Sequence, residues 1–365
     1  MHTKSNQGYN MSNRETQILQ ILKRDPFIQQ QEIADILGIS RSCVAGHIMN
    51  LSKKGYIKGK GYILSNDVYA VTIGATNIDI TSYTFAKVVY DDSNPGKIIS
   101  TPGGVGRNIA QNIAALKNES YLISVVGNDQ HGKLLSEQTK LSGVNIKYLH
   151  KLDDEKTSIC NSFIDENGKC IISVNDMSIL YKLTPSLLTQ SKKLIQNASV
   201  LVLDCNLSQE SLEWIFSHAN NVPIFVDTVS TFKASNIRHW LSYIHTLKPN
   251  RSEAKILSGI EIETLEDAAI AASWFHQQGV QRIILSMDAE GVYYSELDNK
   301  AGHSRALMSN VVNTNGAGDA MMAGLAHCWL AGMTLEDSVQ FSQQCSAFTL
   351  SSEDIVIFPN KFKHR

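Results

Sequence analysis

The stretch Asn313-Thr314-Asn315-Gly316-Ala317-Gly318-Asp319-Ala320 leads directly into an apolar run, residues 321–330, whose pattern predicts a helix. Glycines on either side of Ala317 let the backbone approach a bound anion closely. The free N–H groups and the positive dipole end of the following helix point at the same place. We therefore interpret Gly316, Ala317 and Gly318 as a cradle for a phosphoryl group.

Asp319 stands inside this stretch, where its own negative charge opposes that of a phosphate. Its purpose must therefore differ from anion binding. The economical role is that of a general base, which removes a proton from an attacking hydroxyl group. A glycine turn in which Asp319 only caps the first turn of the helix is the alternative, and the motif by itself does not decide between the two.

Upstream of this stretch, apolar runs of strand length alternate with helical patterns, at residues 69–73, 121–125, 200–203, 224–226, 244–247 and 283–286. Such alternation predicts an α/β fold with a doubly wound, mostly parallel sheet and helices on both faces. Ligands of these folds bind beyond the carboxyl ends of the strands.

Two segments, at about 79–92 and 157–176, do not fit this alternation. The second contains the turn Asp165-Glu166-Asn167-Gly168 and predicts a hairpin. We expect the two segments to form a small β lid that closes over the site and excludes water.

The first part of the chain predicts a separate domain at residues 11–64. Ser12 with Glu15 forms a capping-box pattern, and short helices follow at 30–37, ending at Gly38, and from Ser40 to Gly55. A glycine-containing turn between short helices is typical of the helix-turn-helix motif. Residues 56–64 predict a hairpin, or wing, and the whole stretch resembles the winged helix-turn-helix domains of bacterial regulators.

This domain is basic, with eight basic and four acidic residues between positions 11 and 64, whereas the whole chain has a net charge of −2. Any contact with DNA is therefore expected from this domain alone. The residues that we expect to reach DNA are Arg41, Ser42, Ala45, His47, Lys58 and Lys60. A helix used only for packing or dimerisation is the alternative.

Composition indicates a soluble protein. The 365 residues are 43% hydrophobic and 19% charged, and no apolar run approaches the ~18 residues of a membrane-spanning helix. The amino-terminal ten residues lack the apolar region of a secretory signal. The six cysteines are widely spaced without a CxxC pair, which argues against a zinc site or a disulfide framework. We expect a cytoplasmic protein with no membrane contact.

The stretch around Asp319 resembles the second signature of the ribokinase-like (PfkB) carbohydrate kinase family, and residues 102–110 resemble the first. In that family the paired glycines, here Gly103 and Gly104, let sugar hydroxyls lie against the backbone. The resemblance implies that Asn108 bonds a ribose hydroxyl. It also implies that Asp79, in the Gly-Ala-Thr-Asn-Ile-Asp stretch with Asn77, accepts hydrogen bonds from the sugar.

The resemblance continues in the second half of the chain and covers residues 69–365. Asn250 and Glu253 resemble the N-x-x-E motif, whose members organise Mg²⁺ and its waters beside the phosphates of ATP. Residues 285–291, with Ser286 and Gly291, resemble the strand and glycine turn that line the nucleotide, and Gly316 and Gly318 would also contact it. The implied cofactors are ATP and Mg²⁺.

Within the family, stretches beyond the signatures look like those of bacterial pseudouridine kinases. The implied reaction is transfer of the γ-phosphoryl group of ATP to the 5′-hydroxyl of pseudouridine. Base selection is expected from the lid, from the polar segment 91–97, and from Asn175 and Asp176. We expect a homodimer. Asn313 replaces an aspartate that many members carry, which puts activation by K⁺ in doubt.

Two alternatives remain open from the sequence. One is another kinase of the same family, acting on a different nucleoside or on ribose. The other is a transcriptional regulator whose kinase-like domain only senses a ligand, although the presence of Asp319, Asn250 and Glu253 argues against an inactive enzyme.

Overall fold

The computed structural model describes residues 11–57, 68–297, 300–307 and 315–352. Contacts divide the chain into two compact units, Met1–Asp67 and Val68–Arg365. Lys58, Lys60, Asn313 and most of the expected wing lie outside the described residues.

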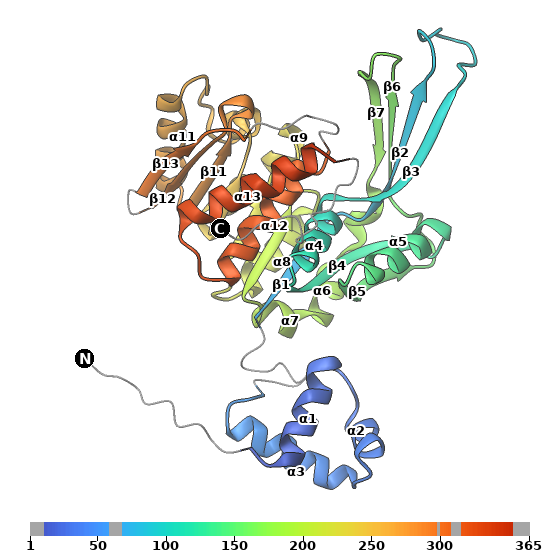
Figure 1. The fold of residues 1–365 in the computed structure, drawn as a ribbon, viewed down its shortest axis with the longest axis vertical. Coiled ribbons are helices and arrows are strands. Elements are labelled where there is room, and N and C mark those ends of the chain that lie inside the picture. Colours follow the sequence, from blue (N-terminus) through green and yellow to red (C-terminus); the bar gives the residue numbers. More distant parts are fainter. Residues whose placement is uncertain (1–10, 58–67, 298–299, 308–314, 353–365) are drawn as a thin grey trace. The chain divides into compact units, whose positions relative to one another are not determined.

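The first unit contains three helices, α1 (Asn13–Arg24), α2 (Gln30–Leu37) and α3 (Arg41–Lys53) (Figure 1). Ser12 and Glu15 form the capping box that the sequence predicts. Gly38 ends α2 in the left-handed conformation at φ 62°, which redirects the chain into α3. Apolar side chains from all three helices, among them Ile18, Ile33 and Val44, form one small core.

The second unit is built on a nine-stranded sheet in the described residues, with the order β13-β12-β11-β10-β9-β8-β1-β4-β5. The strands from β11 to β5 are parallel to one another, and β12 pairs antiparallel with both β11 and β13. Their bounds are β1 (Tyr69–Ile73), β4 (Glu119–Gly127), β5 (Asn145–Leu152), β8 (Val200–Asp204), β9 (Ile224–Asp227), β10 (Thr246–Lys248), β11 (Arg282–Ser286), β12 (Val292–Glu296) and β13 (Lys300–Ser304).

Both faces of this sheet are buried. On one face, Val202 and Ile284 pack in a single core with helices α4 (Val105–Ala115), α12 (Ala317–Leu330) and α13 (Leu335–Leu350) (Figure 1). The alternate residues, such as Leu203 and Leu285, point to the other face and are no more than 1% exposed. The remaining helices are α5 (Gln130–Leu141), α6 (Pro185–Gln190), α7 (Lys192–Gln196), α8 (Gln209–His218), α9 (Thr231–Ala234), α10 (Arg251–Ser258) and α11 (Leu265–Gln277), with 3₁₀ turns at Ser178–Lys182, Ser235–Tyr243 and Asp288–Glu290.

The doubly wound α/β fold predicted from the sequence is thus confirmed, with differences in detail. The run predicted at 244–247 is a strand only at Thr246–Lys248, because Ile244 ends the preceding 3₁₀ turn. The strands β5, β12 and β13 were not predicted.

A second sheet of four strands stands apart from the large one, in the order β3-β2-β6-β7 (Figure 1). Its strands are β2 (Asn77–Thr84), β3 (Gly96–Gly103), β6 (Ile159–Ile164) and β7 (Cys170–Asp176). The Asp165–Gly168 turn joins β6 and β7, with Gly168 at φ 80°. We call this sheet the lid. The return strand β3 was not predicted, because it lies wholly outside the two segments expected to form the lid, 79–92 and 157–176.

The two faces of the lid differ in chemistry. Strand pairing aligns Asp79 with Cys160 and Cys160 with Asn175, so that these three side chains share one face. The opposite face carries the apolar side chains of Ile98 and Ile172, which are 72% and 54% exposed. We call these the Asp79 face and the outer face of the lid.

Candidate active site

Charged side chains gather where three neighbouring strands of the large sheet end. Strands β8, β9 and β10 end at Asp204, Asp227 and Lys248, and strand pairing places Asp227 between the other two. Lys248 Nζ lies 3.0 Å from Asp227 Oδ2, with the two side chains only 8% and 7% exposed. The carboxyl edge, where ligands of such sheets bind, therefore holds a buried ion pair.

Asp204 joins this edge to two other segments of the chain. Its buried Oδ2 accepts hydrogen bonds from the backbone N–H of Ala75, at 2.6 Å, and of Gly106, at 3.0 Å. Ala75 follows β1 at the point where the chain leaves for the lid, and Gly106 lies in the first turn of α4. One carboxylate therefore fixes the end of β1 against the start of α4.

The predicted sugar-binding residues come together beside this junction. A Cβ on Gly103 would lie 1.9 Å from Asp79 Oδ2, and a Cβ on Gly104, at φ 101°, would lie 2.5 Å from Ala75 O, so only glycine allows this packing. Asn77 Nδ2 donates to Asp79 Oδ1 at 2.7 Å. Burial raises the pKa of Asp79, and the hydrogen bond from Asn77 opposes that shift.

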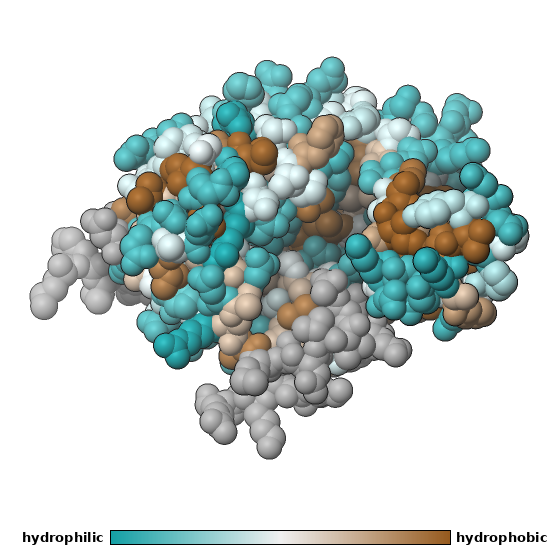
Figure 2. All heavy atoms as spheres, turned by 90° about the horizontal axis from the view of Figure 1, so that it is seen from above, coloured by the Kyte–Doolittle hydropathy of each residue, from teal (hydrophilic) through white to brown (hydrophobic). Residues whose placement is uncertain are grey.

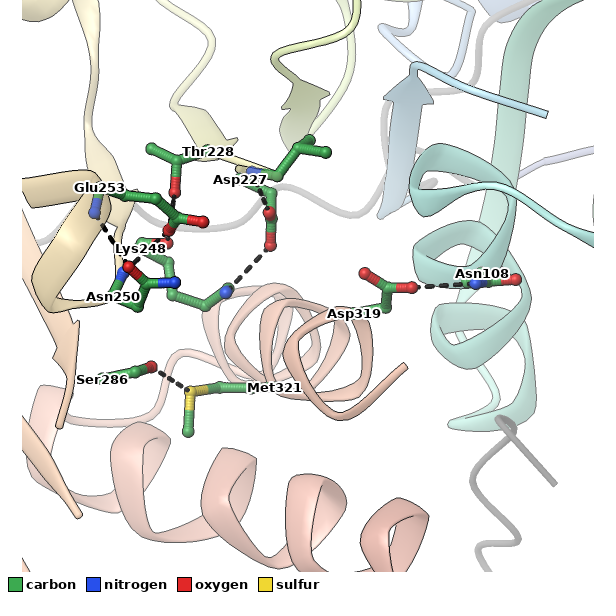
Figure 3. A network of polar contacts seen from close by, with 10 residues as sticks. Asn108, Asp227, Thr228, Lys248, Asn250, Glu253, Ser286, Asp319 and Met321 are labelled. Carbon is green, nitrogen blue, oxygen red and sulfur yellow. Dashed lines mark hydrogen bonds and ion pairs between the residues drawn. The ribbon is translucent and has the colours of Figure 1, made fainter. Parts of the chain in front are cut away.

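Asp319 lies in the first turn of α12, which begins at Ala317 rather than at the predicted residue 321. The helix is capped by Gly316, in the left-handed conformation at φ 79°, with no side-chain cap. The carboxylate of Asp319 instead accepts a hydrogen bond from Asn108 Nδ2 at 2.9 Å (Figure 3). The interpretation of Asp319 as a helix cap is therefore wrong, and the two signature segments meet at this contact.

The protonation of Asp319 depends on its surroundings. The residue is only 9% exposed, and burial together with the negative charge of Asp227 raises its pKa to about 7. The hydrogen bond from Asn108 and the charge of Lys248 act in the opposite direction. A carboxylate with a pKa near neutrality is suited to accept a proton during a reaction at physiological pH.

Sequence reasoning missed Lys248 and Asp227. A Cβ placed on Gly318 would lie 3.4 Å from Lys248 Nζ, so this amine lies beside the glycine cradle. Burial lowers the pKa of Lys248. The charge and the hydrogen bond of Asp227, together with the charges of Glu253 and Asp319, outweigh that effect, and the net shift is upward. A signal was present in the sequence, because a charged residue ends an otherwise apolar strand at both positions.

Asn250 and Glu253 form a capping box at the start of α10. Asn250 Oδ1 accepts from the Glu253 N–H, and Glu253 Oε2 accepts from the Asn250 N–H, both at 2.9 Å. The same Oε2 accepts from the Thr228 hydroxyl at 2.6 Å (Figure 3). These hydrogen bonds hold the two side chains in place, whatever else they do.

The donor set around Asn250 and Glu253 fits a hard cation held largely through water. Both side chains offer oxygen atoms, which Mg²⁺ prefers. No group of three or more histidine, cysteine, aspartate or glutamate side chains suited to a metal is found in the part of the chain that the structure describes. An ion at this position would therefore take most of its coordination from phosphate oxygens and water.

The remaining predicted residues lie at different distances from this centre. Ser286 forms an isolated parallel bridge with Asn250, and its Oγ lies 3.9 Å from Met321 Sδ in α12. Gly291 packs against the end of β13, where a Cβ would lie 2.1 Å from Ser304 O, and no described contact joins it to Asp319. Asn175 is exposed on the Asp79 face of the lid, whereas Asp176 points to the outer face and accepts from Ser178.

In the first unit, α3 presents a polar surface. Arg41 and Ser42 are exposed, while Ala45 and His47 lie half-buried at the border of that surface. The other exposed residues of α3 are Cys43, Gly46, Met49, Asn50, Ser52 and Lys53. Lys54 does not contribute, because its amine forms a 2.9 Å ion pair with the buried Glu15.

A buried aspartate at the amino end of a helix, beside the carboxyl edge of a mostly parallel sheet with a small β lid, is the arrangement that the resemblance to ribokinase-like kinases predicts. Residues 68–359 match the model of the pfkB family carbohydrate kinases. The chain belongs to this family, and is thus a phosphotransferase that acts on a hydroxyl group. Residues 11–58 match a winged helix-turn-helix DNA-binding model.

Relatives of known name support the same assignment. The chain is 50% identical to the pseudouridine kinase of Escherichia coli over 78% of its own length and 91% of that protein. It is 44% identical to the uncharacterised sugar kinase YeiI of the same organism, over 94% of both chains. The structure of an Arabidopsis thaliana ribokinase, complexed with ribose and ATP, has the same fold, with a TM-score of 0.73 at 21% identity over 79% of this chain and 94% of that one.

None of the helices in the described ranges combines the length and the apolar character needed to span a bilayer.

Proposed function

We propose that this protein transfers the γ-phosphoryl group of ATP to the 5′-hydroxyl of pseudouridine. The observation that carries the reaction type is the buried carboxylate of Asp319, with a pKa of about 7, at the amino end of α12. The substrate is supported by the 50% identity to the pseudouridine kinase of Escherichia coli.

The proposed mechanism divides the work among three groups of residues. Asp79 and the backbone of Gly103 and Gly104 hold the ribose. Asp319 accepts the proton of the 5′-hydroxyl while that oxygen forms a bond to the γ-phosphorus, and the bond from the γ-phosphorus to the bridging oxygen breaks to release ADP. The backbone N–H groups at the amino end of α12 stabilise the charge on the transferred group.

The nucleotide and its cation have candidate partners on the same edge of the sheet. We assign Asn250 and Glu253 to the hydration shell of Mg²⁺, and Ser286, Gly291, Gly316 and Gly318 to the nucleotide. When bound, Mg²⁺ neutralises negative charge on the phosphate oxygens.

The test is a transfer assay with radiolabelled ATP over pseudouridine, uridine, adenosine and ribose. We expect the highest kcat/KM with pseudouridine and label on its 5′-oxygen. An Asp319→Asn preparation, purified in the same way, measures contaminating kinases. A preference for ribose or for another nucleoside would change the proposed substrate but not the proposed mechanism. Absence of transfer to all four would favour the ligand-sensing regulator.

The pH dependence of kcat/KM should reflect the protonation of Asp319. We expect kcat/KM to fall as the pH drops below about 7, because protonation removes the base. Asp227→Asn removes a charge that raises this pKa and leaves the charge of Lys248 without its partner. Both changes lower the pKa of Asp319, so the loss of activity should move to a lower pH. Glu210→Gln, at an exposed position of α8, is the control; an unmoved profile in Asp227→Asn contradicts the assignment.

We further propose that the first unit binds DNA through the exposed surface of α3. Support comes from the match of residues 11–58 and from the exposed Arg41 and Ser42. Full-length protein should bind its target DNA more weakly as salt rises, and Arg41→Ala should reduce the salt slope by about 1 if this arginine contacts a phosphate. Arg24→Ala, on α1, is the control. A DNA affinity that changes on adding nucleoside would show that the two units are coupled.

A homodimer is proposed from the outer face of the lid. Ile98, Ile172 and Val174 are 72%, 54% and 58% exposed there, and Figure 2 shows apolar side chains gathered over this part of the molecule. Burying such a surface is favourable. Sedimentation of the full chain tests this: a dimer that Val174→Lys dissociates supports the proposal, and a monomer at all concentrations contradicts it.

A further inference from the structure

Arg107, in the first turn of α4, is a buried cation whose hydrogen-bond partners in the described ranges are all uncharged. The residue is 3% exposed. Its Nε donates to Thr139 Oγ1 at 2.9 Å, and its Nη1 lies 3.3 Å from Pro102 O and 3.4 Å from Asn108 Oδ1. Burying a charge without a directly paired counter-charge is costly. Arg107 interacts with two predicted site residues, with Asn108 through a hydrogen bond and with Asp79 through its charge. These interactions suggest a function that compensates for the cost of burying the charge.

The first consequence concerns Asn108. A guanidinium group only donates hydrogen bonds, so the side chain of Asn108 must turn its oxygen toward Arg107. Its Nδ2 then points at the carboxylate of Asp319, where it donates at 2.9 Å. If the amide turned over, two oxygen atoms would face each other at Asp319. Arg107 therefore selects the one orientation of Asn108 that favours an ionised Asp319.

The second consequence concerns Asp79. Burial raises the pKa of this carboxyl group, whereas the charge of Arg107 lowers it. Burial lowers the pKa of Arg107 itself to about 10, opposed by the charge of Asp79, so the guanidinium stays protonated at neutral pH. The same cation thus favours the charged form of the residue that is proposed to hold the sugar.

We propose that Arg107 is a positioning residue. It fixes the amide of Asn108 against Asp319, and it keeps Asp319 and the sugar-binding Asp79 in position relative to each other. This inference rests on the proposed function. It assigns Arg107 no contact with the substrate, because the side chain is buried behind the site.

The experiment compares Arg107→Gln, Arg107→Lys and Thr139→Val in the full chain. Arg107→Gln should lower kcat by about 10- to 100-fold, as expected for a misplaced reacting group. The pH at which activity is lost should move upward, because Asn108 is no longer held with its Nδ2 toward Asp319 and the carboxylate loses the hydrogen bond that favours its ionised form. Arg107→Lys keeps a charged donor and should recover part of both effects. Thr139→Val removes the partner of Nε alone and should leave the pH profile in place.

A second readout is independent of activity. Titration of the Asp319 carboxyl group, followed by NMR of labelled protein, should give a higher pKa in Arg107→Gln than in wild type. The groups that face Asp319 from β8, β9 and β10, namely Asp204, Asp227 and Lys248, are unchanged in every variant. If Arg107→Gln does not fold, the comparison of Arg107→Lys with wild type takes its place.

Two kinds of failure can be told apart. If the carboxyl titration and the pH profile of the Arg107 variants match those of wild type, Arg107 is only structural and the inference is wrong. If wild type transfers no phosphoryl group but the titration still shifts as expected, the proposed substrate or reaction fails while the positioning of Asp319 by Arg107 stands.

Discussion

Asp319→Asn is expected to lower kcat by about 10²- to 10⁴-fold, the range typical of a lost general base, without unfolding the protein. An amide has nearly the same shape as the carboxyl group and can still accept the hydrogen bond that Asn108 donates at 2.9 Å. It cannot take the proton of the acceptor hydroxyl. Steady-state kinetics gives the loss, and thermal unfolding with nucleotide binding shows that the fold and the site persist.

Glu336→Gln is a matched control, since this acid also lies in the first turn of a helix, α13, but is exposed to solvent. It should retain full turnover. A variant of Asp319 that keeps more than about a tenth of wild-type kcat would remove this residue from the role of base, because general base catalysis contributes more than that.

Lys248→Met should have the largest effect on stability. It leaves the 7% exposed carboxylate of Asp227 without its partner, beside Asp204 on the neighbouring strand. Removing one member of a buried ion pair typically costs about 3–5 kcal/mol, because the remaining charge is left without compensation. Urea unfolding of the variant and of wild type gives the difference in the free energy of unfolding.

The double variant Lys248→Met with Asp227→Asn tests the reason for that loss. Replacing both partners removes the unpaired charge, so most of the stability should return. Lys300→Met is the control and should change stability little, because the Lys300 side chain is 79% exposed and its amine lies 3.9 Å from Glu296. If Lys248→Met alone changes stability as little as this control, the pair of Lys248 and Asp227 does not behave as a buried one.

The parts of the fold that sequence patterns predicted are those with continuous burial. Strands such as β1 and β8 are buried at every position and read as apolar runs. Strand β5 has only two buried residues, Tyr148 and Leu149, and β13, Lys300–Ser304, contains no strongly apolar side chain. Such edge strands are held by pairing with a neighbour rather than by their own apolar content, so no run marks them.

The residues of the candidate site also fall into two groups: those that a short sequence motif marks, and those that only the fold brings together. Residues such as Gly104, Asn108 and Asp319 occur in short motifs, and the resemblance of those motifs to the signatures of a kinase family selected them. Lys248 and Asp227 act through strand register, which pairs two positions 21 residues apart in the chain. Arg107 stands inside a motif, but its part depends on how α4 packs against Thr139 of α5. Contacts between distant segments are what single-residue reasoning cannot supply.

The shared acceptor at Asp204 bears on how substrate range can diversify in proteins built this way. Because one carboxylate holds both the backbone of Ala75 and that of Gly106, the chain is anchored on either side of the excursion through β2 and β3. The segment that contains β2 and β3 can then be lengthened, shortened or exchanged while the residues of phosphoryl transfer keep their geometry. Selection can remodel what the enzyme accepts without rebuilding how it reacts.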